Sequence, residues 1–280
     1  FFLLPFLTLL YISFVDMGND IHPFKPIWDV KTGQLKLNYE NYWSIFRTDN
    51  GVLFDTLYVE AYLRSLLDAL CTALLCLLIG YPFAYFIARS SPNLRPVLLM
   101  MVMLPFWTSF LLRVYAWKGI LADQGVLNKV LIFLGLTSEP IQLLYTNVSM
   151  LVGMTYVYLP FMVLPLYANL VKMDMRLLEA AHDLGASPFK AFWLVTMPLS
   201  RAGIIAGFML VFIPSVGEFV IPSLLGGPQN IIIGRVVWDE MFISNNWPRA
   251  TALAVFMIGL IVIPLTTYYR YTDDSRELGK

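Results

Sequence analysis

The chain has 280 residues, of which 58% are hydrophobic and 14% are charged, and its 19 basic and 19 acidic side chains leave no formal net charge. Soluble domains carry about 25% charged residues, so the composition excludes an ordinary soluble domain and favours an all-α bundle of membrane helices. A net charge of zero gives no reason to expect a nucleic-acid partner.

Six apolar segments predict six membrane spans, because about 20 apolar residues cross a bilayer as a helix. Residues 1–15 are short for a full span, so we expect the chain to begin inside its first membrane helix. No basic stretch precedes them and no small-residue cleavage site follows, which argues against a signal peptide. The other predicted spans are 62–88, 96–117, 143–168, 202–224 and 250–270. We expect residues 1–280 to form a single transmembrane domain, with no internal repeat.

A polar segment, 16–61, separates the first two predicted spans and is rich in Gly, Pro, Asn and charged residues. It is longer than an ordinary loop, which predicts local structure of its own. Its aromatic residues are suited to pack it onto the membrane surface. Two interpretations stay open for this extramembrane segment, a contact for an external partner and a folded cap.

Cysteine and histidine positions indicate no cofactor. Cys71 and Cys76 lie five residues apart in one apolar run and face different ways on a helix, so neither a disulfide nor a metal pair is expected. His22 and His182 are far apart in the sequence and offer no ligand spacing. The chain has no G-x-x-x-x-G-K-[ST] motif, so we expect it to hydrolyse no ATP and not to be an enzyme.

The loop between the fourth and fifth predicted spans, 172–198, carries a distinctive pattern. Apolar residues at helical spacing predict a short helix over 174–184. Gly185 is expected to end that helix, as a C-terminal glycine commonly does. Ser187 and Pro188 predict the start of a second helix, 188–196, which Pro198 is expected to end.

The orientation of the spans follows from the basic residues. The segments 89–95, 172–201 and the C-terminal tail must lie on one side, by counting spans, and they hold nine of the nineteen basic residues in about half the loop length of the opposite side. This excess predicts that the loop 172–198 and both termini are cytoplasmic. The segment 16–61 is then on the outer side, where acidic residues gather.

Ionisable residues inside membrane spans are costly and therefore candidates for function. Glu218, Asp68 and Arg113 are expected at similar depth, and the two carboxylates are suited to hold an amine cation. Aromatic residues that could add cation–π faces or hydroxyl acceptors include Trp107, Tyr156 and Tyr158. The alternative is that Arg113 neutralises Glu218 or Asp68 as a structural pair.

The loop resembles the EAA loop of ABC importer permeases, which reads Glu-Ala-Ala, three residues, Gly, nine residues, then Ile-x-Leu-Pro. Here the last part is Val195-Thr196-Met197-Pro198, which keeps apolar bulk at the two positions that differ. In that family the first short helix docks in a groove of a cytoplasmic ATPase subunit and transmits its motion. The resemblance thus implies coupling residues Glu179, Ala180, Ala181, Asp183, Leu184, Gly185 and Ala186.

Further segments, among them LPFWTSFLLRVYAWKGIL and AGFMLVFIPSVGEFVIPSLLGG, look like the putrescine/spermidine ABC permeases, closest to the putrescine-type first permease subunit. The resemblance implies a type I ABC importer permease fold in a bacterial inner membrane. It implies as partners a second homologous permease, a dimer of ATPase subunits that bind ATP, and a periplasmic polyamine-binding protein. The alternatives are a permease of this family for an amino acid, sulfate or iron, and a secondary transporter acting alone.

Overall fold

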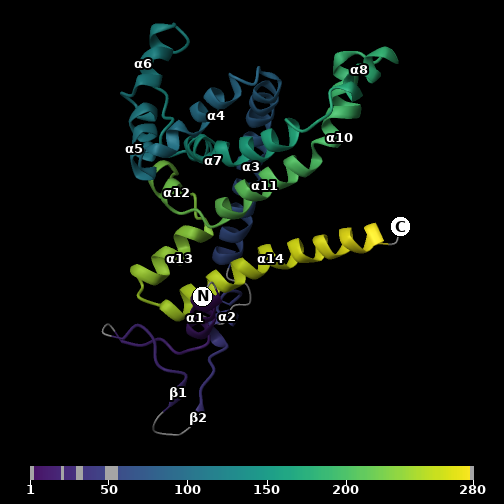
Figure 1. Ribbon diagram of the computed structural model, residues 1–280. Coiled ribbons are helices and arrows are strands. Elements are labelled where there is room, and N and C mark those ends of the chain that lie inside the picture. Colours follow the sequence, from purple (N-terminus) through teal and green to yellow (C-terminus); the bar gives the residue numbers. More distant parts are fainter. Residues whose placement is uncertain (1–2, 20–21, 30–33, 48–55, 278–280) are drawn as a thin grey trace. The chain divides into compact units, whose positions relative to one another are not determined.

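The structure, a computed structural model, describes residues 3–19, 22–29, 34–47 and 56–277. The chain divides into two compact units, the first made of Phe1–Ser65 with Ile231–Lys280 and the second of Leu66–Asn230. The long helix α3 (Thr56–Arg89) begins in the first unit and continues into the second (Figure 1).

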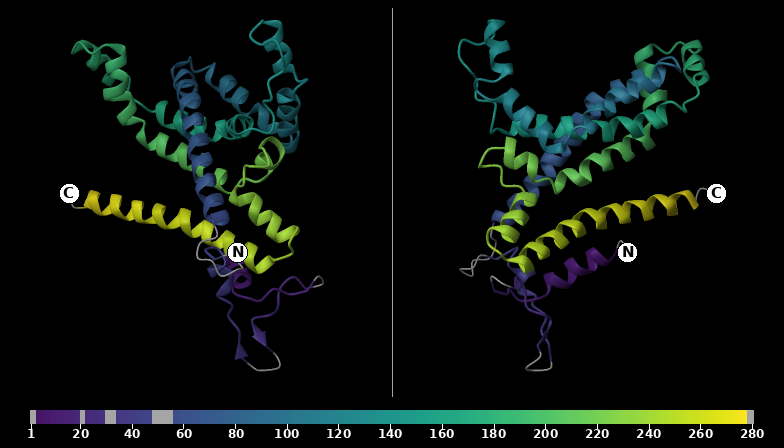
Figure 2. Two further views of the ribbon diagram at one scale, coloured as in Figure 1. Left: turned by 180° about the vertical axis from the view of Figure 1, so that it is seen from behind. Right: turned by 60° about the vertical axis from the view of Figure 1, so that its left-hand side comes forward.

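Helices from both ends of the chain build the first unit. Helix α1 runs beside α14, as Figure 2 shows, and α13 packs against α14. Two buried hydrogen bonds tie the first turns of α3 to this group: Tyr62 Oη donates to the Leu253 carbonyl at 2.6 Å, and Ser65 Oγ accepts from the Ile233 amide at 2.8 Å. Besides the start of α3, the elements are α1 (Leu3–Ser13), β1 (Trp28–Asp29), β2 (Gln34–Leu35), α2 (Glu40–Trp43), α13 (Ile233–Phe242) and α14 (Trp247–Glu277).

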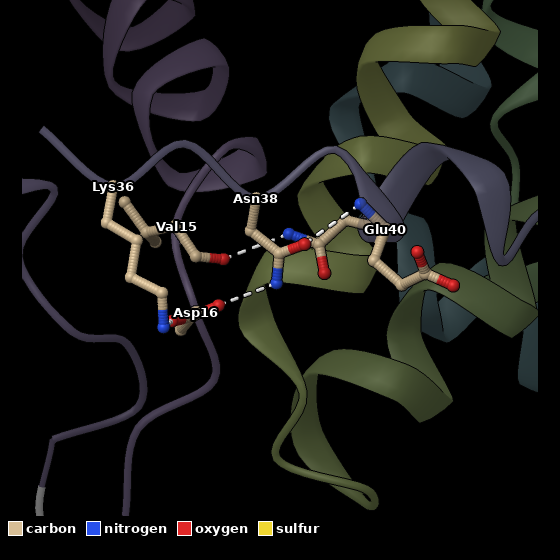
Figure 3. A network of polar contacts seen from close by, with 6 residues as sticks. Val15, Asp16, Lys36, Asn38 and Glu40 are labelled. Atoms are coloured by element: carbon tan, nitrogen blue, oxygen red, sulfur yellow. Dashed lines mark hydrogen bonds and ion pairs between the residues drawn. The ribbon is translucent and has the colours of Figure 1, made fainter.

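The predicted local structure of the polar segment is present in its described parts. Strands β1 and β2 pair antiparallel, with Trp28 opposite Leu35. Asp16 accepts hydrogen bonds from Lys36 Nζ at 2.6 Å and Asn38 Nδ2 at 2.7 Å (Figure 3). The Lys36 ammonium is the main reason that the pKa of Asp16 lies below its ordinary value. This network fixes the entry to α2, because Asn38 Oδ1 accepts from the Glu40 amide at 2.8 Å.

Helices α7 and α11, which lie side by side, form the centre of the second unit (Figure 1). A Cβ atom on Gly203 would lie 2.8 Å from Asn169 Cβ, and one on Gly207 would lie 3.1 Å from the Met162 carbonyl oxygen. Gly203 and Gly207 form a G-x-x-x-G pattern, which lets two membrane helices approach closely.

Helices α5 and α12 contact α7, and α10 contacts α11, while the other elements of the second unit supply the loops discussed below. In chain order the unit contains the remainder of α3, α4 (Arg95–Met103), η1 (Leu104–Trp107), α5 (Phe110–Leu121), α6 (Val126–Phe133), α7 (Asn147–Leu170), α8 (Arg176–Asp183), α9 (Pro188–Ala191), η2 (Phe192–Thr196), α10 (Met197–Leu199), α11 (Arg201–Val216) and α12 (Val220–Leu225).

Among the described residues, two straight helices are long and apolar enough to cross a membrane, Leu57–Arg89 and Asn147–Leu170. Each matches a predicted span. The number rises to four if two bent helix pairs each count as one span, and the apolar helices Leu3–Ser13 and Trp247–Ile263 are shorter. The structure is therefore helical with several candidate spans, and the count of six stays a prediction.

Two predicted spans are interrupted rather than straight. The segment predicted as 96–117 bends by 89° between η1 and α5, where Thr108 is extended. Pro105 lacks an amide hydrogen, which favours ending the helix there in a tight 3₁₀ turn. In the segment predicted as a span over 202–224, the helix ends at Val216 and a new helix begins at Val220. Gly217 is a poor helix former, and the amides that follow donate to the Glu218 carboxylate instead of to backbone carbonyls.

Candidate functional site

The first part of the loop 172–198 forms the expected helix and glycine turn. Helix α8 begins where Asp174 Oδ1 accepts from the Arg176 amide at 3.0 Å, and it ends at Asp183. Gly185 has φ +80° and donates from its amide to the His182 carbonyl at 2.9 Å. The amide of Ala186 donates to the Ala181 carbonyl at 2.9 Å. This pair of bonds is the Schellman motif, so the predicted glycine stop is confirmed.

The second part of the loop starts as predicted but does not end at Pro198. Ser187 Oγ accepts from the Lys190 amide at 3.4 Å, and Pro188 takes the first helical position. Helical turns then continue through α9, the π-helical segment η2 and α10 as far as Leu199, where the axis bends by 66° into α11. The predicted stop was wrong because Pro198 is the second residue of α10, in a first turn whose amide hydrogens have no acceptor within the helix.

Helix α8 presents most of the predicted coupling residues to the outside. Leu178 is its buried residue, while Glu179, Ala180 and Asp183 are exposed. Leu184, just after the helix, is 89% exposed. Of the remaining predicted residues Gly185 is exposed, and Ala181 and Ala186 are half-buried. An apolar and acidic helix face that is this open and held by a fixed turn is suited to dock on another protein.

The second candidate site lies around Glu218, between α11 and α12. Tyr158 Oη, on α7, donates to Glu218 Oε2 at 2.6 Å. The other oxygen, Oε1, accepts from the amides of Phe219, Val220 and Ile221 at 3.2, 3.0 and 3.4 Å. These are the amides at the start of α12, so the carboxylate caps that helix. Sequence reasoning missed this role, although a carboxylate directly before a new apolar helix is a recognisable cap signal.

Aromatic rings connect this carboxylate to Arg113. The ring of Tyr158 lies 6.2 Å from that of Phe161, which in turn lies 5.3 Å from Phe106. Arg113 Cζ sits 4.9 Å from the centroid of Phe106. The suggested ion pair between Arg113 and Glu218 is not formed: within the described part of the chain, Arg113 Nε and Nη1 are buried without a hydrogen-bond partner.

The other predicted pathway residues have separate surroundings. Asp68 is half-buried on α3, and its carbonyl accepts from Thr72 Oγ1 at 2.7 Å. The ring of Tyr156 packs edge-on against Trp117, with centroids 5.5 Å apart, and lines two apolar cavities of about 320 and 490 Å³. Trp107 is 77% exposed at the end of η1. The structure thus brings Glu218 and Tyr158 into direct contact, whereas Tyr156 and Trp107 face elsewhere.

A further cavity of about 250 Å³ lies beneath α8 and was not anticipated from the sequence. Arg89, the last residue of α3, reaches into it, and Glu179 and His182 of α8 form part of its wall. A basic residue in the last turn of a helix is common, so nothing in the local pattern around Arg89 pointed to this position.

Comparisons with known proteins show the family to which the chain belongs. Residues 62–275 match the family described as "Binding-protein-dependent transport system inner membrane component". The chain is 40% identical over 271 residues to the spermidine/putrescine transport system permease protein PotB of Haemophilus influenzae, covering 96% of this chain and 88% of that protein. It is 41% identical over 237 residues to PotB of Escherichia coli, covering 84% of this chain and 85% of that protein.

A solved structure shares the fold at lower identity. A bacterial alginate ABC transporter, in complex with its alginate pentasaccharide-bound periplasmic protein, has a chain that superposes with a TM-score of 0.58. That chain is 18% identical, and the match covers 87% of this chain and 84% of that one. The likeness therefore shows the ABC importer permease fold, while the sequence relatives carry any argument about substrate.

Proposed function

The chain belongs to the family of binding-protein-dependent transport system inner membrane components, and we propose that it takes part in the import of polyamines such as putrescine and spermidine. As a member of the family it is a multi-pass permease subunit of an inner-membrane ABC transporter and not itself an enzyme. The observation that supports a polyamine substrate is the 40% identity to a spermidine/putrescine permease over 96% of the chain.

The complex that we propose has a second homologous permease beside this chain in the membrane. Two ATPase subunits lie on its cytoplasmic side, and a polyamine-binding protein lies on its periplasmic side. In this arrangement six spans place the loop 172–198 and both termini in the cytoplasm. Closure of the ATPase dimer on ATP moves α8 through Glu179, Ala180, Ala181, Asp183, Leu184, Gly185 and Ala186. The Schellman turn supports this role, because it holds α8 as a rigid piece attached to the next helix.

The substrate path that we propose runs past Glu218. A polyamine carries ammonium groups, which a carboxylate in a low-dielectric surrounding attracts. The rings of Tyr158, Phe161 and Phe106 follow one another from that carboxylate, and such faces bind cations weakly. Weak binding suits a transport site, which must also release its substrate. Asp68, Trp107 and Tyr156 complete the set of proposed pathway residues.

The experiment that tests this function is uptake of radiolabelled putrescine and spermidine into proteoliposomes. The vesicles hold the complete complex, with the binding protein outside and ATP inside. ATP-dependent uptake of either polyamine supports the proposal. Uptake of an amino acid, sulfate or iron but of no polyamine would show that the proposed substrate is wrong, while the assignment as a permease subunit would stand. Polyamine uptake that needs a gradient but no ATP points to a secondary transporter and overturns the proposed mechanism.

A further inference from the structure

Arg89 places an uncompensated positive charge under the coupling loop. Both of its terminal nitrogens, Nη1 and Nη2, are buried without a hydrogen-bond partner among the described residues. Its Cζ lies 4.9 Å from the ring centroid of Tyr85, one turn earlier on α3. A guanidinium has donors in a fixed fork that suits a carboxylate, and leaving them buried and unpaired is costly. The group therefore calls for an acceptor.

The cavity that contains Arg89 lies between the end of α3 and the loop. Its walls come from three parts of the second unit: Tyr85 and Arg89 of α3, four residues from Met175 to His182, and four residues of the following turns from Pro188 to Thr196. Thr196, in the π-helical segment η2, also has a buried Oγ1 without a partner in the described structure. Two unsatisfied polar groups thus line the same space of about 250 Å³.

Glu179 is the carboxylate that lines the same cavity as Arg89. Met175, Leu178, Glu179 and His182 follow helical spacing, so Glu179, although exposed, lies beside the buried Leu178 and borders the cavity. In the described structure its carboxylate makes no ion pair. His182 is engaged in its own turn, where its Nδ1 lies 3.0 Å from the Ala186 carbonyl oxygen and so donates to it.

We propose that Arg89 is a positioning residue for coupling, which pairs with the Glu179 carboxylate when α8 moves into the cavity. The pair would join the coupling helix to the cytoplasmic end of α3, so motion of one would be transmitted to the other. The inference rests on the proposed coupling role of the loop but not on the identity of the substrate. In the structure described here both groups line the cavity without forming an ion pair with each other, so the proposed pairing requires α8 to move.

Cross-linking in the assembled complex tests the distance directly. Cys71 and Cys76 are first replaced by serine, and Arg89→Cys with Glu179→Cys is then treated with a short bifunctional thiosulfonate. We expect the cross-link yield to differ several-fold between nucleotide-free and ATP–vanadate-trapped complexes. The matched control is Arg95→Cys with Glu179→Cys, since Arg95 lies near the same helix end but donates from Nε to the Ser90 carbonyl and does not line the cavity. Equal yields for the test pair in both states would overturn the proposal.

Charge exchange tests the function of the pair. Arg89→Glu alone should reduce binding-protein-stimulated ATPase activity about tenfold, the loss expected when about 1.4 kcal/mol of pairing is removed. Combining it with Glu179→Arg should recover at least half of the activity, whereas Arg95→Glu with Glu179→Arg should not. No recovery together with a state-independent cross-link means that the cavity holds water or a small anion instead of Glu179. If the cross-linking and charge-exchange results are as expected but the wild-type complex takes up no polyamine, only the proposed substrate is contradicted.

Discussion

The hydroxyl of Tyr158 donates a 2.6 Å hydrogen bond to Glu218, which lies sixty positions further along the chain. Tyr158 is buried at 7% exposure, and the carboxylate that it contacts also holds three backbone amides. One side chain therefore links α7 to the start of α12. The same carboxylate is the group that we propose to attract the substrate, so its structural and transport roles must be separated by experiment.

Replacing Tyr158 by phenylalanine should destabilise the second unit. The change removes a donor to a charged acceptor, a bond worth about 1.5–3 kcal/mol. Thermal unfolding of the detergent-solubilised complex measures the effect. Tyr156→Phe is the matched control, because its hydroxyl makes no hydrogen bond within the described structure and it lies two residues away on the same helix. Equal melting temperatures for the two variants would show that the bond to Glu218 contributes little.

Replacing Glu218 by glutamine should separate the cap from the charge. The glutamine oxygen can still accept from the amides of α12, so insertion and assembly should be retained. ATP-driven polyamine uptake should fall about tenfold, since losing about 1.4 kcal/mol of attraction for the ammonium changes binding by that factor. Uptake is measured together with binding-protein-stimulated ATPase activity. Unchanged uptake would leave Glu218 with its capping role alone and would leave selectivity mainly with the binding protein.

Gly185→Ala tests the turn at the end of α8. Nothing lies within 4 Å of the added Cβ, so the cost comes from the backbone alone. At φ +80° an L-residue is disfavoured by about 1–2 kcal/mol. That shifts the population of the turn by a factor of about 5–30 and should reduce coupled uptake to a similar degree while leaving membrane insertion intact.

Two other glycines serve as controls for that variant. Gly135 has φ +68° and equally open surroundings, but lies outside the coupling loop, so Gly135→Ala should leave uptake largely unchanged. Gly119 lies within α5 without positive φ, and Gly119→Ala should be neutral or slightly stabilising. If Gly185→Ala transports as well as Gly119→Ala, the rigid turn is not needed for coupling.

Gly203→Ala should loosen the contact between α7 and α11. The new methyl group would meet Asn169 Cβ at 2.8 Å and the Pro165 carbonyl oxygen at 3.1 Å, neither of which is the free end of a flexible side chain. Overpacking of this kind costs about 1–3 kcal/mol. The expected result is a lower melting temperature than for Gly119→Ala, measured on the purified complex. A melting temperature as high as that of Gly119→Ala would mean that the two helices separate without cost.

The Asp16 network should weaken in acid. The pKa of Asp16 is below the ordinary value of 3.8 chiefly because of the hydrogen bond from Lys36, so the folded state favours the charged carboxylate. The stabilisation is present above the unfolded pKa and is lost as the pH falls below it through the folded value. An exposed pair of this kind contributes about 0.2–1 kcal/mol. The hydrogen-exchange rate of the Asn38 backbone amide, corrected for the intrinsic pH dependence of exchange, should therefore increase below about pH 3.8.

Asp16→Asn supplies the comparison for this pH dependence. Its exchange at Asn38 should be faster than that of the wild type near neutral pH and should show no further acceleration in acid. Asp239→Asn, which removes a half-buried carboxylate 3.8 Å from Arg235, should leave the exchange at Asn38 unaffected. Acid acceleration of equal size in wild type and Asp16→Asn would assign the effect to another group.

Features that depend on near neighbours could be predicted from the amino-acid sequence. Long apolar runs predicted helices that match α3 and α7, because burial of such a run and satisfaction of its backbone in a membrane need no distant partner. The glycine stop at Gly185 was predictable for the same reason, since positive φ is a property of the residue and its turn. The family resemblance rested on these local patterns, and the comparisons confirmed it.

The contacts between distant side chains depend on how the helices pack and could not be predicted from the amino-acid sequence. Spacing along the chain predicted that Glu218 and Arg113 lie at similar depth in the membrane. In the packed structure Glu218 instead accepts a hydrogen bond from Tyr158, and the Arg113 guanidinium lies over the ring of Phe106. The bend after Leu199 and the cavity around Arg89 likewise depend on how three segments pack together. Local spacing fixes the face of a helix on which a residue lies, whereas the rotation and separation of that helix relative to its neighbours are set by the side chains of both.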